Sequence, residues 1–397
     1  MLDWLIVGGG AHGTAISHYL TARCGVPRDQ LRVLDPHDRP LALWHQFTAN
    51  TGMAYLRSPL AHHLHDDVGS LKTFALTADG ADHARFIPKF NRPSLALFNA
   101  HCEWMLRRYD LEALRIGGRA GGLTRLTDGW AVTTDSGEIE SRRVLLALGA
   151  TEQPLWPEWA CDLRASGAPI DHIFAPEFVT DRLPPSEHTV VIGGGITAVQ
   201  TALLLAARQP GTITLLRRHG VQIADFDSDP CWSGPLCLND FCAEPDPNRR
   251  RAIIDQARHR GSLPPDVADA LESARRAGTL KTQQGEVIAA AAGDMGIALH
   301  LTDCVVPIRA DRVVLATGFA SARPGGAWLD RAIADHDLPA AACGYPIVDA
   351  GLCWAPGLYV TGPLAELAIG PASRNLIGAR LAARRIGAHI TQTPGNR

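Results

Sequence analysis

The chain has 397 residues, enough for two or three domains at the usual ~100–200 residues per domain. Its 38 basic and 41 acidic residues nearly cancel, so the net charge of −3 predicts no attraction to nucleic acid or to a membrane surface. No apolar run approaches the ~20 residues of a membrane-spanning helix. We therefore expect an ordinary soluble globular protein.

The first motif follows a short apolar run at residues 4–7. Gly8, Gly10 and Gly13 fit the pattern G-x-G-x-x-G between a predicted strand and a predicted helix. In this motif the first glycine allows a tight turn, the second lets the backbone approach a pyrophosphate, and the third lets helix and strand pack closely. The helix N-terminus adds free N–H groups for the phosphates. The pattern predicts a dinucleotide site and, by its position, no signal peptide.

Asp35 ends a second apolar run at residues 31–34, somewhat beyond the usual ~20-residue interval after the glycines. An acidic residue at this place accepts a hydrogen bond from an adenosine ribose hydroxyl. Asp35 therefore strengthens the prediction of a dinucleotide site.

The same pattern returns as G-x-G-x-x-A at Gly193, Gly195 and Ala198. The apolar run after its helix, residues 212–216, leads into Arg217 and Arg218 instead of an acidic residue. A carboxylate there would repel a 2′-phosphate, whereas a guanidinium pairs with it. The second site is thus predicted to take NADPH rather than NADH; a solvated arginine pair is the alternative.

The duplication extends beyond the glycine loops. Residues 311–319 repeat residues 142–150 almost position for position, and each segment follows a predicted β-meander. Proline-rich stretches at 153–157 and 184–185 indicate a crossover between domains. The insert at 220–283 has an irregular part followed by a helical one. Two dinucleotide modules are therefore expected.

Two further helices are predicted from proline positions. One opens at Arg92, with Pro93 in its first turn, and runs to about Tyr109. The other opens at Gly370, with Pro371 at the first helical position, after a short strand at 358–363.

The nine cysteines include no C-x-x-C pair, so we expect neither a redox dithiol motif nor a zinc knuckle, but buried thiols in a reducing compartment. The run at residues 62–67 contains His62, His63, His65, Asp66 and Asp67. Adjacent histidines rarely point to one centre, so no metal site is expected, and the run is interpreted as a loop facing cofactor, substrate or solvent.

Together these motifs resemble the two-dinucleotide-binding-domain flavoproteins over essentially the whole chain. The resemblance implies an α/β fold with two Rossmann-like dinucleotide-binding domains, ββα-type sheets and β-meanders, the NADPH domain being inserted in the FAD domain. Residues 1–160 would form the first part of the FAD domain, 161–319 the NAD(P)H domain, and 320–397 the C-terminal return of the FAD domain.

The resemblance also implies the residues that bind FAD and NADPH. The glycine loops, the ends of the strands that follow them and the tail supply most of these residues. The expected cofactor-binding residues are Gly8, Gly10, Ala11, His12, Gly13, Asp35, Trp44, His45, Met53, Gly149, Gly193, Gly195, Ile196, Thr197, Arg217, Arg218, Thr317, Gly318, Gly362, Gly370 and Pro371.

Within that group the chain resembles class B flavin monooxygenases, in particular the N-hydroxylating lysine/ornithine branch. The sequence Ala-Thr-Gly-Phe at 316–319 is similar to the end of the NADPH module there, and Leu-Trp-His at 43–45 with residues 52–59 resembles the segment around the flavin ring. Residues 167–174 resemble the G-x-x-x-H fingerprint, with one extra residue before His172 and without its final Trp. His172, Arg57 and His62 are the candidate catalytic residues.

The resemblance implies that NADPH reduces the flavin, which captures O2 as a C4a-(hydro)peroxide and oxygenates a small nucleophile, with N-hydroxylation of an amine expected. The alternative is an NAD(P)H:acceptor oxidoreductase that passes electrons to a quinone, a ferredoxin or another acceptor; its disulfide-reductase version is disfavoured by the missing C-x-x-C. A third alternative is a flavin-bound regulatory protein. A homo-oligomer is compatible with each alternative.

Overall fold

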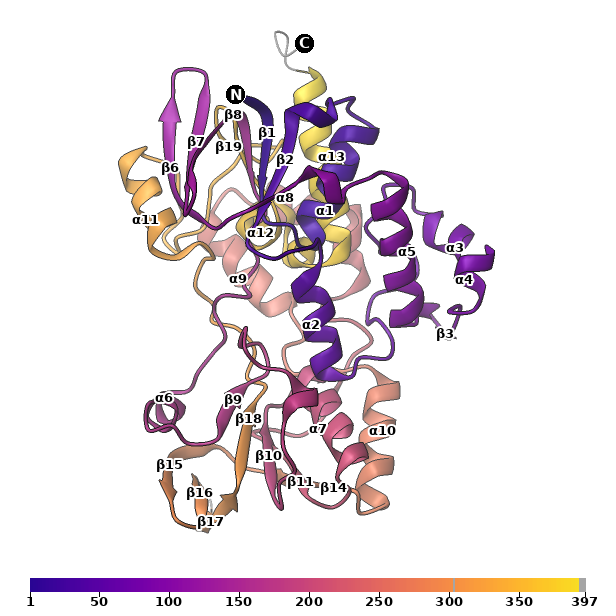
Figure 1. The fold of residues 1–397 in the computed structure, drawn as a ribbon, viewed down its shortest axis with the longest axis vertical. Helices are drawn as coiled ribbons and strands as arrows, with labels where there is room; N and C mark the ends of the chain where they lie inside the picture. Colours follow the sequence, from indigo (N-terminus) through magenta and orange to yellow (C-terminus); the bar gives the residue numbers. More distant parts are fainter. Residues whose placement is uncertain (303, 393–397) are drawn as a thin grey trace.

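The computed structural model describes residues 1–302 and 304–392, which form two main sheets, the first mixed and the second parallel, with the first above the second in Figure 1. The first sheet has the order β19-β20-β8-β1-β2-β5, and β6 and β7 extend the first half of β8 as an antiparallel meander. Its central strand β1 is apolar on both faces because it is buried on both faces. The strands are β1 (Leu2–Val7), β2 (Leu31–Asp35), β5 (Arg115–Gly117), β6 (Ala120–Leu126), β7 (Gly129–Thr134), β8 (Gly137–Leu146), β19 (Cys353–Ala355) and β20 (Leu358–Val360).

The second sheet has the order β14-β11-β10-β18-β9, with every neighbouring pair parallel. A separate three-stranded antiparallel sheet accompanies it, where the first module has a meander that is joined to its main sheet. The strands are β9 (Ile170–His172), β10 (Thr189–Ile192), β11 (Ile213–Arg217), β14 (Leu280–Gln284), β18 (Arg312–Leu315), β15 (Val287–Gly293), β16 (Gly296–Leu301) and β17 (Cys304–Ala310). The short strands are β3 (Phe86–Ile87), β4 (Arg92–Pro93), β12 (Gln222–Ile223) and β13 (Ser262–Leu263).

The two sheets share one arrangement around the strand that precedes each glycine loop. In the first, Val7 lies opposite Leu34, and in the second Ile192 lies opposite Leu216. On the other side, β8 flanks β1 just as β18 flanks β10. This equivalence confirms the predicted duplication.

Each glycine loop leads into a helix on one face of its sheet, α1 in the first module and α7 in the second (Figure 1). The remaining helices cover the sheets or join the modules. The helices are α1 (Ala11–Ala22), α2 (Ala42–Thr51), α3 (Ser70–Phe74), α4 (Ala78–Ala81), α5 (Leu95–Arg108), α6 (Glu158–Ala165), α7 (Ile196–Arg208), α8 (Pro235–Ala243), α9 (Pro247–Ala257), α10 (Pro265–Arg276), α11 (Gly326–Asp335), α12 (Glu366–Ile369) and α13 (Leu376–Gln392).

The C-terminal segment returns to the first module. Strand β20 pairs in parallel with β8, and α13 packs along α1, so the two ends of the chain share one core (Figure 1). The two crossovers between modules pair with each other, since Leu155 donates its N–H to Gly318 and Ala320 donates to Gln153. The second module is therefore inserted in the first, as predicted; the segment boundaries at 160/161 and 319/320 stay predictions.

A second excursion leaves the second module after β11. Helices α8 and α9 reach the first module, where Phe241 and Ile254 pack with Tyr345 and Leu367 into a small core. The chain then returns through β13 to α10 on the second sheet. This insert thus joins the two modules a third time.

Two expectations are wrong. The helix predicted to open at Arg92 begins at Leu95, because Ser94 is its N-cap and accepts a hydrogen bond from the Leu97 N–H, while Pro93 lies in strand β4. The cysteines are not generally buried thiols. A disulfide joins Cys231 to Cys237, and four of the free thiols are exposed: Cys161, Cys242, Cys304 and Cys343.

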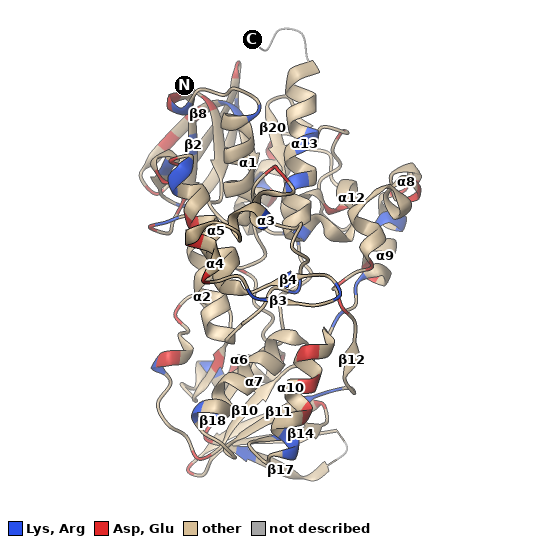
Figure 2. Ribbon diagram, turned by 90° about the vertical axis from the view of Figure 1, so that its right-hand side faces the viewer, with Lys and Arg blue, Asp and Glu red and all other residues tan. Residues whose placement is uncertain are grey.

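Figure 2 shows acidic and basic residues scattered along the ribbon of both modules. Within the described ranges, no helix combines the length and the hydropathy needed to cross a bilayer.

Candidate functional site

The first glycine loop has the three properties that a pyrophosphate site needs. Gly8 has a φ of +112°, and a Cβ added there would lie 2.5 Å from the Ala147 carbonyl oxygen. A Cβ at Gly13 would lie 1.8 Å from the Gly8 carbonyl oxygen, so helix and turn touch at that point. A Cβ at Gly10 would meet no atom of the described chain within 4 Å. The loop is therefore tight where it packs and open in front of the N-terminus of α1.

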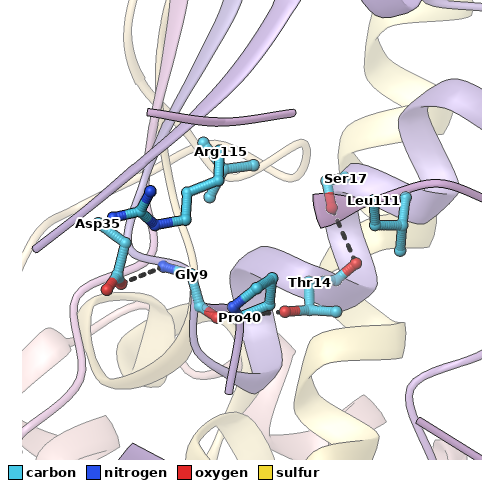
Figure 3. Close-up of a pocket in the computed structure, with 8 residues that line it drawn as sticks. Gly9, Thr14, Ser17, Asp35, Pro40, Leu111 and Arg115 are labelled. Carbon is cyan, nitrogen blue, oxygen red and sulfur yellow. Dashed lines mark hydrogen bonds between the residues drawn. The ribbon is translucent and has the colours of Figure 1, made fainter. Parts of the chain in front are cut away.

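Asp35 ends β2 beside this loop, as Figure 3 shows. Its Oδ2 accepts a hydrogen bond from the Gly9 N–H at 2.6 Å, and its Oδ1 accepts one from the His37 N–H at 2.9 Å. A small cavity of about 10 Å³, room for no more than one water molecule, is lined in part by Asp35, Thr14 and Arg115. The carboxylate thus shapes the glycine loop, a function that its predicted ribose contact does not include.

A larger hollow of about 430 Å³ opens beyond Asp35. It lies where β2 and β5 end and the β6–β7 hairpin begins, which is the edge at which parallel sheets bind their ligands. Its lining residues are Pro36, Gly118, Arg119, Ala120, Gly121, Thr133, Thr134 and Asp135.

The second glycine loop repeats the first with two changes. A Cβ at Gly193 would lie 2.5 Å from the Ala316 carbonyl oxygen, the equivalent of the Gly8 contact. However, a Cβ at Gly194 would lie 3.0 Å from the His219 ring, and one at Gly195 would lie 3.5 Å from Gly261 Cα. Residues that follow β11 therefore lie against Gly194 and Gly195, whereas in the first loop Gly9 meets Asp35 and Gly10 meets no described atom within 4 Å.

Arg217 and Arg218 differ sharply in their surroundings. Arg217 is the fifth residue of β11, as Asp35 is the fifth of β2. Its Nε and Nη1 are out of contact with solvent and have no hydrogen-bond partner in the described part of the chain. Arg218 is exposed and lies 3.3 Å from Glu286. A desolvated cationic group without a partner is costly, so the two arginines are not equivalent, and Arg217 is the one whose guanidinium lacks a partner among the described residues.

The tail is tied to the first glycine loop through His12. Its Nδ1 lies 2.9 Å from the Thr361 hydroxyl, and its Nε2 lies 3.2 Å from the Asn375 carbonyl oxygen. Burial lowers the pKa of His12 to about 4, so the ring is neutral near pH 7. Gly362 and Gly370 have φ values of +61° and +87°, and they shape the bend that brings the tail beside α1.

Helix α2 carries Trp44 and His45 and bridges the two modules. The Trp44 Nε1 donates to Asn99 at 2.9 Å, and burial together with Arg39 lowers the pKa of His45. Met53 follows the helix and packs against the first core. At the far end of α2, Asn50 accepts a hydrogen bond from the Thr180 N–H. These predicted flavin-side residues thus lie on one rigid helix and its C-terminal turn.

The three candidate catalytic residues do not come together. Arg57 donates to the carbonyl oxygens of residues 224–226 and to Ser262, so it holds the insert in place. His172 is fully buried, its Nε2 lies 3.1 Å from the Thr317 hydroxyl, and its Nδ1 accepts the Phe174 N–H. Burial is the main cause that lowers the pKa of both His172 and His62 to about 4. With its nitrogens satisfied, His172 joins β9 to the end of β18.

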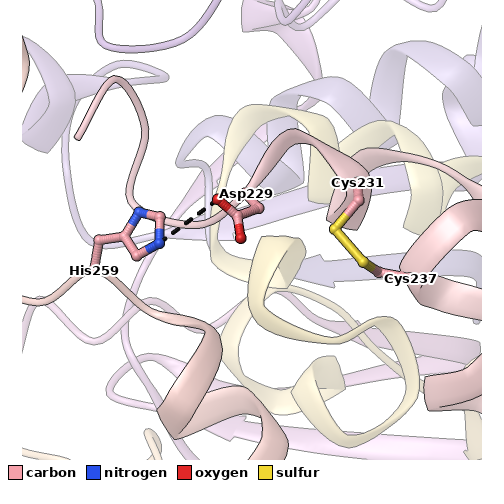
Figure 4. Close-up of a disulfide and its surroundings, with 4 residues drawn as sticks. All are labelled: Asp229, Cys231, Cys237 and His259. Carbon is pink, nitrogen blue, oxygen red and sulfur yellow. Dashed lines mark ion pairs between the residues drawn. A yellow bond between two sulfur atoms is a disulfide. The ribbon is translucent and has the colours of Figure 1, made fainter.

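Two features of the insert were missed by sequence reasoning. The Cys231–Cys237 disulfide joins the turn before α8 to the first turn of α8, with Asp229 lying 3.7 Å from His259 next to it (Figure 4). The six-residue spacing of the two cysteines was a usable signal. The loop packs against the tail, since a Cβ added at Gly370 would contact Leu238, Trp232 and Phe241.

The other missed feature is a buried ionic cluster between insert and tail. Glu366 is fully buried and pairs with Arg251, Arg258 and Arg374. Although burial opposes it, the pKa of Glu366 lies below its usual value because Arg258, Arg374 and Arg251 surround it. Its members come from the insert and the tail, which are distant in the sequence, so no local sequence pattern predicts that they pair.

Several solved structures share this fold over nearly their whole length. An L-lysine 6-monooxygenase from Pseudomonas syringae is 20% identical, with 98% of this chain and 99% of that chain covered and a TM-score of 0.70. An ornithine N-hydroxylase from Kutzneria sp. 744, solved with reduced FAD, NADP+ and L-ornithine, is 16% identical, with 99% of both chains covered and a TM-score of 0.74. A cadaverine monooxygenase from Erwinia amylovora bound to FAD is 15% identical, with 97% and 94% covered and a TM-score of 0.74.

No curated protein sequence matches the chain significantly. A family model does: the pyridine nucleotide-disulphide oxidoreductase model matches residues 2–376. The match begins at β1 and ends at the start of α13, so it spans both glycine loops and the returning tail. The protein therefore belongs to the pyridine nucleotide-disulphide oxidoreductase family.

Proposed function

We propose that this protein is an FAD-dependent, NADPH-using monooxygenase that hydroxylates the nitrogen of a small amine. The observation that carries the cofactor assignment is the contrast between Asp35 and Arg217 at one position of two equivalent modules. An acid suits the ribose of FAD, and an unpartnered guanidinium suits the 2′-phosphate of NADPH. The amine is supported by the lysine, ornithine and cadaverine enzymes that share the fold.

In this proposal the residues of the chain position the cofactors and exclude water from them. The open face of Gly10 and the N-terminus of α1 bind the FAD pyrophosphate, and the predicted cofactor-binding residues of α2 and the tail surround the flavin. When bound, FAD accepts reducing equivalents from NADPH and activates O2. Arg57 holds the insert against the segment after α2, and the Glu366 cluster holds it against the tail. Held in this way, the insert would exclude water from the space between the modules.

The remaining proposals concern partners. The protein would act in the cytoplasm on an amine and O2, with no nucleic-acid or membrane partner. Its nearly balanced surface charge supports this assignment.

The test is a balance of NADPH, oxygen and product. The purified flavoprotein is incubated with NADPH and, in separate reactions, with lysine, ornithine, cadaverine and other primary amines. Mass spectrometry is expected to find a product one oxygen atom heavier than one amine, formed in proportion to NADPH consumed, with little peroxide released.

Two other outcomes would contradict the proposal. Reduction of a quinone or ferredoxin at the expense of NADPH, with no oxygenated amine, would identify an acceptor oxidoreductase. A bound flavin that NADPH fails to reduce would identify a binding or regulatory protein.

A further inference from the structure

The histidine-rich loop at residues 62–67 turns its polar atoms toward partners within the chain. His65 is buried, so the loop does not simply face solvent, as one alternative had it. His18 donates to a carboxylate oxygen of Asp66 at 3.0 Å, and the Asp67 N–H donates to His65 Nδ1 at 3.0 Å. These atoms are already engaged with one another. A histidine of the second module differs from them.

His219 lies against the middle glycine of the second glycine loop. A Cβ added at Gly194 would lie 3.0 Å from its ring, and so would a Cβ added at Gly261. The ring is therefore held between the glycine loop and the residue that precedes β13. Gly261 has a φ of +74°, which favours glycine, and its missing side chain leaves room for the ring.

The first module has an acidic side chain at the corresponding place. A Cβ added at Gly9, the middle glycine there, would lie 3.2 Å from Asp35, whose carboxylate accepts the Gly9 N–H (Figure 3). Arg217 has the strand position of Asp35 in the second module, but the side chain that contacts the middle glycine is His219, two residues later. The place from which Asp35 is predicted to contact a ribose is thus filled in the second module by an imidazole.

The two ring nitrogens of His219 have different surroundings. Its Nδ1 lies 2.9 Å from the Gly220 carbonyl oxygen, which can only accept, so Nδ1 carries a proton. Its Nε2 would lie 3.1 Å from a Cβ at Gly194 and makes no hydrogen bond with the residues that the structure describes. In the imidazolium form Nε2 carries a proton as well, and a nearby phosphate stabilises that form. Nε2 can therefore donate to an anion beside the second glycine loop.

We propose that His219 determines the specificity for NADPH, because its Nε2 donates to the 2′-phosphate together with the Arg217 guanidinium. This inference rests on the NADPH site of the proposed function. A hydrogen bond between charged groups is roughly twice as strong as a neutral one, so the phosphate of NADPH gains more from an imidazolium than the ribose hydroxyl of NADH does. The other cation of the same turn, Arg218, pairs with Glu286.

The test uses two nucleotides that differ only in the 2′-phosphate, adenosine 2′,5′-bisphosphate and 5′-AMP. Each is titrated into the full flavoprotein by calorimetry. The unmodified protein is expected to bind the bisphosphate more tightly. His219→Ala should weaken binding of the bisphosphate about tenfold or more, because a charge-assisted hydrogen bond is lost, and should leave the affinity for 5′-AMP within about threefold.

Two further variants separate hydrogen bonding from packing. His219→Gln keeps an N–H donor on a side chain of similar reach and should retain part of the preference for the bisphosphate. His300→Ala removes an exposed histidine from β16 of the same module and should change neither affinity. Equal weakening of both nucleotides by His219→Ala, without rescue by His219→Gln, would show that the ring only packs against the loop and would overturn the proposal.

A second measurement needs no variant. Diethyl pyrocarbonate acylates accessible imidazole nitrogens, and peptide mass spectrometry quantifies the modification of His219. The bisphosphate is expected to protect His219, and 5′-AMP is not. Equal protection by both nucleotides, or by neither, would overturn the proposal.

Failure of this proposal is distinguishable from failure of the NADPH assignment. An unmodified protein that binds the two nucleotides equally would overturn both. A preference for the bisphosphate that Arg217→Met removes and His219→Ala leaves intact would overturn only the role of His219.

Discussion

Replacing Arg217 by Met should separate the two nicotinamide cofactors. Methionine keeps much of the side-chain volume and removes the guanidinium, whose Nε and Nη1 are desolvated and unpartnered among the described residues. A hydrogen bond between charged groups contributes about 1.5–3 kcal/mol. Its loss corresponds to a roughly 10- to 150-fold rise in the KM for NADPH, at about 1.4 kcal/mol per tenfold. The KM for NADH should change little.

The matched control is Arg218→Met. Arg218 is 73% exposed in its side chain and pairs with Glu286 at the surface, where such pairs contribute about 0–1 kcal/mol. We therefore expect less than about a fivefold change in the KM for NADPH. Flavin reduction is followed by stopped-flow absorbance at several concentrations of each cofactor.

Arg217→Met should also be at least as stable as the unmodified protein when no NADPH is present, because it removes a desolvation penalty that no partner offsets. Equal losses with NADPH and NADH, or a larger loss in Arg218→Met, would refute the assignment of Arg217 to the 2′-phosphate. A large fall in Tm would show that the Arg217 guanidinium stabilises the fold through a contact of its own.

Three further experiments test the fold around the site: a pair of glycine variants, a variant of Glu366 and a pH series. Gly13→Ala puts a methyl group 1.8 Å from the Gly8 carbonyl oxygen and should lower both Tm and flavin content. The methyl group of Gly10→Ala meets no described atom within 4 Å, so this variant should lower flavin content alone. Equal effects of the two variants on the Tm of the apoprotein would argue against this distinction. Glu366→Gln strands three arginines and should lower the free energy of unfolding by about 3–5 kcal/mol in urea titrations, and a loss below about 1 kcal/mol would be inconsistent with a buried pair. Burial lowers the pKa of His12 and His172 from 6.5 to about 4, so the free energy of unfolding should be highest above pH 6.5 and fall as the pH drops toward 4. The expected loss is up to about 1.4 kcal/mol per pH unit for each histidine. A urea midpoint that is constant from pH 7 to pH 4.5 would contradict this expectation.

The features predicted from sequence are those whose signal is local. Each glycine motif, its flanking apolar runs and the residue that ends the next strand lie within about thirty positions, and strand periodicity places Asp35 and Arg217 at equivalent ends. The choice between Arg217 and Arg218 needed the structure, because only the packing around β11 shows which side chain lacks a partner.

Features that depend on distant segments were not predictable. Arg57 looked available for chemistry, yet the insert arrives from more than 160 positions away and occupies its nitrogens. The approach of His18 to Asp66 depends on how the loop packs against α1. Helix α5 begins three residues later than predicted because Ser94 is its N-cap, so Pro93 lies before the helix and not in its first turn.

The return of β20 and α13 to the first module has a consequence for synthesis of the chain. The second sheet is built from residues 170–315, so it is complete while the ribosome is still translating the tail. The first sheet lacks β19 and β20, and α1 lacks its packing helix, until the tail has emerged. Because domains fold as units once their residues are available, the nascent chain holds a finished second module beside an unfinished first one. A message truncated before residue 350 would accordingly yield a protein with one assembled module and no completed first glycine site.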